Sequence, residues 1–210
     1  MDKPSKILFL DIETFSSWNK PSIDDLQPPA NYKDATVIQK WKEANLDLAW
    51  RRQALSITKG QIICIGYAID DNPVDYIFST EESKLMERFA EVVEPNPYIQ
   101  FCTHNGKRFD LPWLWLRAVK YNLKYLKSII PHSRNDNAII DTMEVFSASS
   151  FGSDSWLSLD ELCKFLGIEG KGDMDGSKVH DAYVNEEYDK ITTYCVADVE
   201  KVRTIYKMTQ

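Results

Sequence analysis

The chain has 210 residues, 43% hydrophobic and 12% aromatic, a composition that excludes a disordered protein and suffices for a domain with a hydrophobic core. The formal net charge of −7 excludes attraction by the whole molecule as the basis of nucleic-acid binding, so any such site needs a local basic patch or bound cations. The four cysteines include no C-x-x-C pair, and no apolar run approaches the roughly 18 residues of a membrane span. These features argue against a zinc site, a disulfide framework and a membrane protein, and they favour a cytoplasmic one.

Strand and helix periodicities alternate along the chain. In chain order, the sequence predicts a strand at 6–13, an irregular segment followed by a helix at 35–55, strands at 61–70 and 74–80, a helix at 81–93, a strand at 98–105, a helix at 111–123, a strand around 138–146, and helices at 158–167 and from about 185 to 207. Strands followed by alternating helices predict an α/β fold in which helices flank a mixed β-sheet.

Residues 15–58 interrupt this alternation as a long connection after the first strand. Their first half is rich in proline and turn-forming residues, and 35–55 has a helical period. We interpret 15–58 as a partly helical insertion within a single domain that spans 1–210. A connection of this length either has a function of its own or covers an exposed edge of the sheet, and the sequence leaves both open.

Two carboxylates stand at the end of the first predicted strand, in the stretch KILFLDIET. Asp11 and Glu13 are two residues apart, so both side chains leave the strand on the same face. Neighbouring carboxylates repel each other at neutral pH unless one is protonated or a cation lies between them, and Mg²⁺ prefers carboxylate oxygen. The pair therefore predicts a metal site. The alternative is a strand end that has simply reached solvent.

A third acid, Asp110, follows a predicted strand in the stretch HNGKRFDLPWL and precedes a predicted helix. It is a candidate metal ligand, and the alternative is a helix N-cap, since a helix N-terminus favours an anionic side chain. In the same stretch, Asn105 offers an amide to a sugar or phosphate, and Phe109 offers an aromatic face to a base. We interpret His104 and Asp141 as structural.

The fourth acid lies in the stretch TTYCVADVEKV of the last predicted helix. Tyr194 and Asp198 are four residues apart and so share a face, at the border of a buried stripe that includes Cys195, Val199 and Val202. An acid at that border needs a partner, which makes the pair a candidate for the same site. The alternative is a surface Tyr–Asp pair.

Residues 107–134 form a basic segment in an otherwise acidic chain. Against one acid, Asp110, it contains Lys107, Arg108, Arg117, Lys120, Lys124, Lys127 and Arg134. Arg117, Lys120 and Lys124 are spaced along one helical face with Trp113, and interleaved basic and aromatic groups suit single-stranded nucleic acid. The alternative is a solvated basic face with Trp113 in the core.

Three stretches, FLDIET, HNGKRFDLP and YCVAD, in this order resemble the motifs of the DEDD superfamily of 3′–5′ exonucleases. The second half of the chain resembles the stand-alone group related to the exonuclease domain of family B DNA polymerases. Tyr194 stands four residues before the last acid, and Thr193 replaces a histidine, so the chain resembles the tyrosine (DEDDy) branch. The resemblance spans residues 6 to about 206, with 15–58 as its least typical part, and it implies an RNase H-like (DnaQ-like) fold.

This resemblance implies metal-dependent hydrolysis of phosphodiester bonds at the 3′ end of nucleic acid, above all of single-stranded DNA. By a two-metal-ion mechanism, two divalent cations, Mg²⁺ or Mn²⁺, would bind to Asp11, Glu13, Asp110 and Asp198. Asp11 would bridge both ions, and Tyr194 would orient the attacking water. The residues expected to contact the nucleic acid are Thr14, Asn105, Lys107, Arg108 and Phe109.

Two alternatives share the same fold: a catalytically weak or inactive module that binds nucleic-acid 3′ ends, and an exonuclease directed to RNA. A third is a structural or interaction protein whose acids are caps and surface groups. The expected partner is nucleic acid, with a polymerase or another replication or repair protein beside it, and no membrane. The sequence leaves open the oligomeric state and a role in proofreading, repair or a mobile element.

Overall fold

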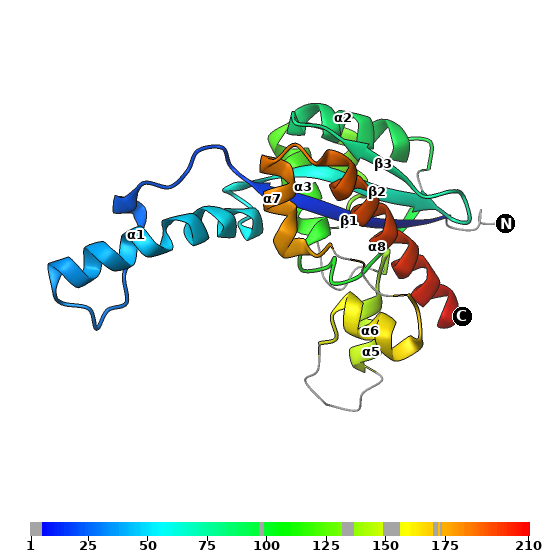
Figure 1. Ribbon diagram of the computed structural model, residues 1–210. Helices are drawn as coiled ribbons and strands as arrows, with labels where there is room; N and C mark the ends of the chain where they lie inside the picture. The colour runs from blue at the N-terminus through cyan, green and yellow to red at the C-terminus, as the bar shows by residue number, and fades with distance from the viewer. Residues whose placement is uncertain (1–5, 97–98, 132–136, 149–155, 170–171, 173) are drawn as a thin grey trace. The chain divides into compact units, whose positions relative to one another are not determined.

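A mixed β-sheet lies at the centre of the fold (Figure 1). The computed structural model describes residues 6–96, 99–131, 137–148, 156–169, 172 and 174–210. Within these residues, five strands form one sheet in the order β3–β2–β1–β4–β5. Their bounds are β1 (Lys6–Ser16), β2 (Gly60–Ile69), β3 (Asp75–Phe78), β4 (Ile99–Thr103) and β5 (Ile139–Asp141). Strands β1, β4 and β5 run parallel, whereas β2 and β3 are antiparallel, which confirms the predicted α/β fold with a mixed sheet.

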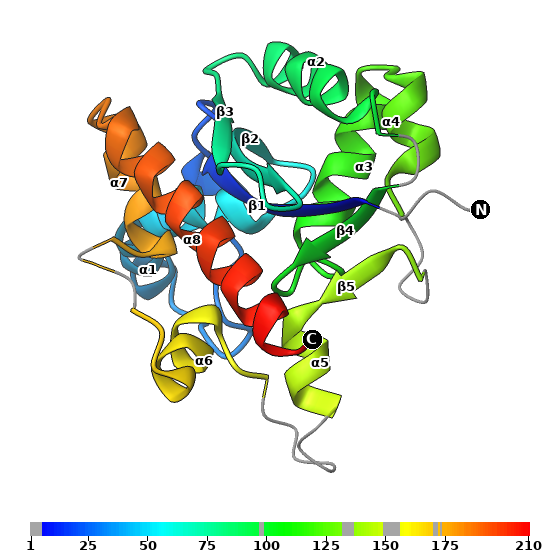
Figure 2. The same ribbon diagram turned by 90° about the vertical axis from the view of Figure 1, so that its right-hand side faces the viewer.

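The helices account for most of the remaining described residues. Their bounds are α1 (Ala35–Arg52), α2 (Glu82–Val93), α3 (Asp110–Lys120), α4 (Lys124–Ile129), α5 (Thr142–Ala148), α6 (Leu159–Leu166), α7 (Val179–Val184) and α8 (Tyr188–Met208), with short 3-10 turns at Ile23–Asp25, Gln53–Leu55 and Gly176–Lys178. Helices α2, α3 and α4 lie on one side of the sheet, and α6 and α8 lie on the other (Figure 2).

The chain separates into two compact units, one of which is Thr14–Gln61 and the other the rest of the chain. The smaller unit contains the predicted insertion and its helix, α1. Asp34 caps this helix, because its carboxylate accepts hydrogen bonds from the backbone N–H groups of Thr36 and Val37 at 2.8 and 3.1 Å. Near the other end of α1, the buried Trp50 donates its indole N–H to the Ser17 carbonyl at 2.7 Å. The single domain over 1–210 stays a prediction.

Helix α8 packs closely against the sheet. A side chain at Gly66 of β2 would come within 2.9 Å of both Cys195 Sγ and Val199 Cγ2, so glycine allows the helix to approach this strand. Phe9 of β1 and Val202 belong to the same buried cluster. This contact fixes the position of the last helix, and therefore of Asp198, relative to the strand that carries Asp11.

Several predicted element boundaries are wrong: the first strand extends to Ser16 instead of 13, and helix α3 ends at Lys120 instead of 123. The strand around 138–146 ends at Asp141, because the Asp141 carboxylate accepts the backbone N–H of Met143 at 3.1 Å and helix α5 starts at Thr142. The last helix starts at Tyr188 rather than near 185, since Glu186 adopts a positive φ of 58° that ends the unpredicted helix α7.

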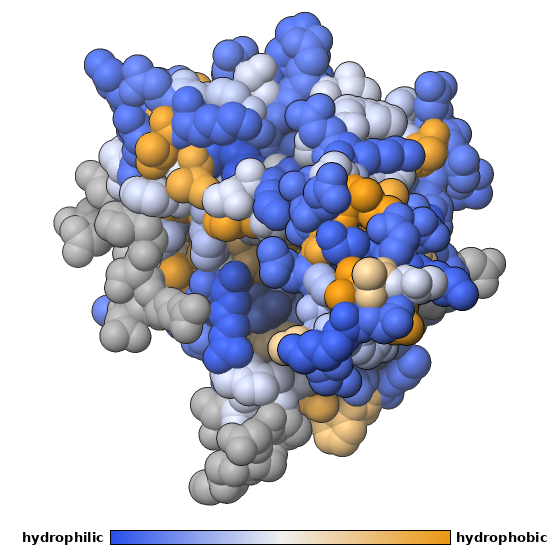
Figure 3. All heavy atoms as spheres, turned by 90° about the vertical axis from the view of Figure 1, so that its left-hand side faces the viewer, coloured by the Kyte–Doolittle hydropathy of each residue, from blue (hydrophilic) through white to orange (hydrophobic). Residues whose placement is uncertain are grey.

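The surface seen in Figure 3 is mostly hydrophilic, and apolar side chains appear on it in small groups. Among the described residues, no helix has the length and apolar character that crossing a membrane requires.

Candidate active site

A cavity of about 270 Å³ collects the acids that the sequence places far apart. Three elements supply them: strand β1, the start of helix α3 and the middle of helix α8. The lining residues are Asp11, Ile12, Glu13, His104, Asn105, Phe109, Asp110, Met143, Ser158, Leu159, Tyr194 and Asp198. The structure thus brings together all four candidate metal ligands with Tyr194, Asn105 and Phe109.

Asp11 and Glu13 lie where β1 continues past its pairing with β4, whose last pair joins Phe9 to Cys102. Glu13 is only 8% exposed, so the alternative of a strand end that has reached solvent is wrong for Glu13, whereas Asp11 is partly exposed. One carboxylate oxygen of Asp11, one of Glu13 and the Sγ atom of Cys195 all lie within 4.8 Å of one another. Two carboxylates this close to each other have the chemistry of a site for a hard divalent cation.

Asp110 ties the start of α3 to strand β1. Its Oδ1 atom accepts the backbone N–H of Ile12 at 3.0 Å, and the residue is 3% exposed. The N-cap position belongs to Phe109, so the alternative in which Asp110 is a simple N-cap is wrong. Burial raises the pKa of Asp110 to about 7, against the lowering effect of its backbone hydrogen bonds, and the Asp141 carboxylate raises it further.

This raised pKa predicts a pH-dependent stability of the metal-free protein. The native Asp110 carboxyl keeps its proton up to about pH 7, whereas the unfolded chain loses it near the ordinary value of 3.8. The native state binds more protons in this window, so the contribution of Asp110 to the free energy of unfolding should fall as pH rises from about 4 to about 7. Thermal denaturation in EDTA should show this slope in the wild type and a smaller one in Asp110→Asn. Equal slopes would contradict the assignment.

Tyr194 and Asp198 face the cavity from α8, one helical turn apart. They are 7% and 4% exposed, so the alternative of a surface pair is wrong. Burial raises the pKa of Tyr194 well above its ordinary value of 10.0, and the nearby charges of Asp198, Glu13 and Asp11 raise it further. The phenol therefore keeps its proton at neutral pH, so it can donate a hydrogen bond but is not available as a phenolate base.

The loop between β4 and α3 is held by Asp141, which the sequence reasoning treats as structural. The Asp141 carboxylate accepts the backbone N–H groups of Asn105 at 2.8 Å and Lys107 at 3.0 Å. Asn105 adopts a positive φ of 64° within this turn. A side chain at Gly106 would come within 2.1 Å of Thr103 Oγ1, so the turn requires glycine. Asp141 thereby fixes the loop from which Asn105 faces the cavity.

His104 also has a structural environment. Its Nδ1 atom lies 2.9 Å from Thr142 Oγ1, and its Nε2 atom lies 3.0 Å from the Leu157 carbonyl oxygen. The ring therefore joins the end of β4 to the start of α5 and to the segment that leads into α6.

The other three candidate contacts to nucleic acid are not among the residues that line the cavity. The Lys107 ammonium forms an ion pair with Glu144 at 2.7 Å. The Arg108 guanidinium lies 3.8 Å from the centre of the Trp156 ring. Thr14 belongs to the smaller unit, where its hydroxyl donates to the Ala54 carbonyl at 2.7 Å.

The basic residues of 107–134 do not form one exposed helical face. The interpretation of this segment as a surface for single-stranded nucleic acid is therefore wrong. Trp113 is 2% exposed and packs in the core, and Arg117 is 3% exposed with its Nε atom 2.6 Å from Glu82 Oε1. Helix α3 ends at Lys120 and α4 begins at Lys124, so these two lysines do not continue a single helical row. Arg134 lies outside the described residues.

Comparison with protein families decides the relationship of the chain. Residues 72–209 match a family described as a predicted 3′–5′ exonuclease related to the exonuclease domain of PolB. The chain belongs to this family. The matched region carries Asp110, Tyr194 and Asp198, whereas Asp11 and Glu13 precede it. No curated protein sequence matches this member of the PolB-related exonuclease family.

The solved structures show the same fold. The family B DNA polymerase from the hyperthermophilic archaeon Pyrobaculum calidifontis superposes on 98% of the chain with a TM-score of 0.58 and 14% sequence identity. The match spans 24% of the polymerase chain, so the chain spans about a quarter of the length of that relative. The predicted RNase H-like fold is confirmed.

Two contacts of the acids are not predicted from the sequence. The Lys201 ammonium donates to Asp198 Oδ1 at 2.9 Å, and the thiol of Cys195 lies 3.7 Å from Asp11 Oδ2. Both lie on α8, within three residues of Asp198. A buried acid in a predicted stripe needs a partner, and the spacing of three residues to Lys201 was the signal that could have found it.

Proposed function

We propose that the chain is a metal-dependent 3′–5′ exonuclease that hydrolyses phosphodiester bonds at the 3′ end of nucleic acid, above all of single-stranded DNA. The observation that carries this proposal is the convergence of Asp11, Glu13, Asp110 and Asp198 on one cavity. Family membership supports the reaction class, since the family is described as predicted 3′–5′ exonucleases.

The donor set fits the metal ions that such a reaction uses. Carboxylate oxygens are the preferred ligands of Mg²⁺ and Mn²⁺, and four carboxylates from three elements line the cavity. Asp11, Glu13, Asp110 and Asp198 would hold the ions. When bound, the two cations would supply an activated water and stabilise the charge on the leaving 3′ oxygen.

Three further residues of the cavity are proposed to bind and orient the substrate. Tyr194, as in the tyrosine (DEDDy) branch, donates a hydrogen bond that orients the attacking water. Phe109 offers a ring face to the terminal base, and Asn105, held in place by Asp141, offers its amide to the sugar or phosphate. Lys107, Arg108 and Thr14, which do not line the cavity, stay proposed contacts to the nucleic acid.

Side-by-side degradation of labelled substrates tests this function. Single-stranded DNA, duplex DNA and RNA, each labelled at the 3′ end, are incubated with the protein in Mn²⁺, in Mg²⁺ and in EDTA. We expect release of labelled mononucleotides from single-stranded DNA in either metal and none in EDTA. An intact 3′-labelled strand in Mn²⁺ would contradict the proposal, and preferred release from RNA would change only the substrate.

Tyr194→Phe provides a graded test of the same site. The substitution removes one hydrogen-bond donor and keeps the ring, so we expect metal-dependent release of mononucleotides to fall about tenfold to a hundredfold. The rate of release at saturating single-stranded DNA measures it. An unchanged rate would remove Tyr194 from the proposed mechanism.

One observation favours a second candidate, a catalytically weak or inactive module that grips 3′ ends. Asp198 is held by the Lys201 ammonium at 2.9 Å, so one of the four carboxylates already has a cationic partner. Tight binding of single-stranded DNA in Mn²⁺ without loss of its 3′ label would support this candidate.

The setting of the proposed activity is also a proposal. We place the protein in the cytoplasm, because the four cysteines are free and buried, as a reducing compartment allows. A polymerase or another replication or repair protein would supply or use the trimmed 3′ ends.

A further inference from the structure

Lys201 is a buried cation beside one of the proposed metal ligands. Its side chain is 9% exposed and that of Asp198 is 5% exposed, and their ammonium and carboxylate atoms lie 2.9 Å apart. Among the described residues, the Lys201 ammonium forms its recorded ion pair and hydrogen bond with Asp198. A lysine buried in this way requires a compensating charge, so the pair is a built feature of α8 and not a surface contact.

The charge of Lys201 has a direct consequence for the cavity. Asp198 faces the same cavity as Asp11 and Glu13, and all three charges act on Tyr194. Without a cation, the three carboxylates repel one another, and a fixed ammonium on Asp198 reduces this repulsion. A divalent cation that approaches Asp198 meets the same ammonium as a like charge and competes with it for the carboxylate.

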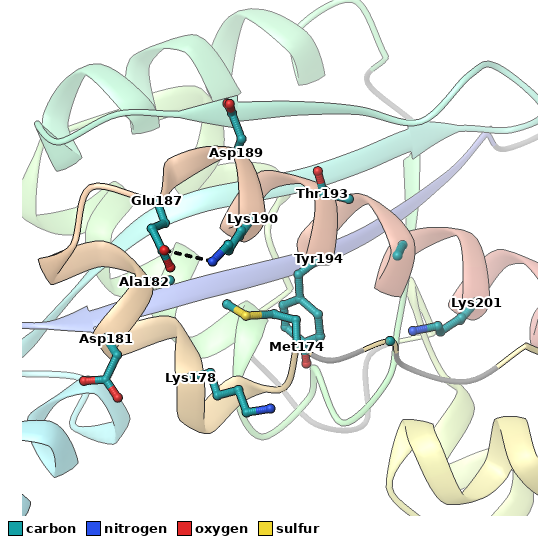
Figure 4. Close-up of a pocket in the computed structure, with 12 residues that line it drawn as sticks. Met174, Lys178, Asp181, Ala182, Glu187, Asp189, Lys190, Thr193, Tyr194 and Lys201 are labelled. Carbon is teal, nitrogen blue, oxygen red and sulfur yellow. Dashed lines mark hydrogen bonds and ion pairs between the residues drawn. The ribbon is translucent and has the colours of Figure 1, made fainter.

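Lys201 and Tyr194 also border a second cavity, of about 760 Å³, along α8 (Figure 4). Figure 4 shows the Lys201 side chain directed along the helix toward Tyr194. The pair lies within one helix at a spacing of three residues, so a change of side-chain rotamer is enough to separate the two groups.

We propose that Lys201 is a positioning residue that acts as a built-in counter-cation for Asp198 in the metal-free protein and is displaced when a divalent cation binds there. This inference rests on the proposed function and adds a regulation to it. Lys201 holds Asp198 in place before metal arrives, and it lowers the affinity of the site for the ion that shares Asp198. The site is thus ordered without metal and responds to metal concentration.

Metal binding without nucleic acid tests this role. Calorimetric titration with Mn²⁺ compares the wild type with Lys201→Met, which keeps the length of the side chain and removes the charge. Lys190→Met is the matched control, because Lys190 lies on the same helix and pairs with Glu187 at 2.8 Å, with its side chain 61% exposed. We expect Lys201→Met to bind Mn²⁺ at least about tenfold more tightly and to melt at a lower temperature in EDTA, and Lys190→Met to match the wild type.

A measurement on the wild type covers the case in which Lys201→Met fails to fold. Lysines are labelled with an amine-reactive reagent in EDTA and in Mg²⁺, and each site is quantified by mass spectrometry. Lys201 should be protected in EDTA and several-fold more reactive in Mg²⁺, with Lys190 equally reactive in both. Unchanged reactivity of Lys201, or Mn²⁺ affinity equal to or weaker than that of the wild type in folded Lys201→Met, would overturn the proposal. Absence of Mn²⁺ binding in wild type and variant alike would overturn the metal-dependent function as well.

Discussion

Asp11→Asn should reduce the metal-dependent release of mononucleotides from single-stranded DNA by at least about a thousandfold, a barrier increase of about 4 kcal/mol or more. The substitution keeps the shape of the side chain and removes the charge that lies beside Glu13 in the cavity. Asp11 is one of the residues that would hold the ions, so the loss of its charge would weaken metal binding at the cavity. The initial rate of release from a 3′-labelled strand in Mn²⁺ measures the effect.

Asp71→Asn is the matched control for this experiment. Asp71 is an exposed acid whose side chain is 83% exposed and pairs with Lys207, away from the cavity. The Asp71→Asn variant should release mononucleotides at the wild-type rate, since exposed ion pairs contribute about 0–1 kcal/mol to stability. The rate of mononucleotide release should fall in Asp198→Asn as it does in Asp11→Asn. An Asp11→Asn protein with more than about a tenth of the wild-type rate would exclude the two-metal site.

Glu82→Ala should cost about 3–5 kcal/mol in the free energy of unfolding, although Glu82 lies outside the cavity. The Glu82 carboxylate accepts hydrogen bonds from the backbone N–H of Ile62 at 2.8 Å, Arg117 Nε at 2.6 Å, the Lys120 ammonium at 3.0 Å and the Tyr121 hydroxyl at 2.6 Å. Its removal leaves Arg117, 3% exposed, as a buried charge without this carboxylate. Urea denaturation monitored by circular dichroism measures the loss.

Glu81→Ala is the control for Glu82→Ala, one residue earlier. Glu81 pairs with Lys84 at 2.6 Å, but both side chains are about 60% exposed, so the expected cost is about 0–1 kcal/mol. Similar costs for the two variants would show that the Glu82 network does not stabilise the fold.

Acid should weaken the Glu82 network. Burial raises the pKa of Glu82, but hydrogen bonds from Tyr121, Ile62 and Arg117 outweigh burial and leave the pKa below its ordinary value of 4.5. The stabilisation is therefore present above about pH 4.5 and is lost as pH falls through the lower native pKa.

Asp11, Glu13, Tyr194 and Asp198 lie on elements that the sequence pattern predicts. Asp11 and Glu13 alternate with buried residues on a strand, and their shared face follows from the strand geometry alone. Tyr194 and Asp198 follow the 3.6-residue period of a long helix. Their meeting in one cavity does not follow from any local pattern, and the sequence indicates it only through the resemblance to a known family.

Other features depend on tertiary contacts that the sequence pattern does not reveal. The spacing of Arg117 and Trp113 fits an exposed basic face. In the structure, the Arg117 guanidinium instead donates a buried hydrogen bond to Glu82, 35 residues earlier in the chain. The predicted strand around 138–146 is too long, because the Asp141 carboxylate accepts a backbone N–H group and a helix starts at the next residue. Lys201 reads as an ordinary surface lysine until the burial of Asp198 is known.

The central claim is that Asp11, Glu13, Asp110 and Asp198 together bind divalent cations. Anomalous diffraction from a crystal of the protein soaked in Mn²⁺ tests it most directly. We predict manganese peaks in the cavity, within coordination distance of Asp11, Glu13 and Asp198, and their loss in Asp11→Asn. A cavity that stays empty while manganese binds elsewhere, or carboxylates that point to separate places, would contradict the account.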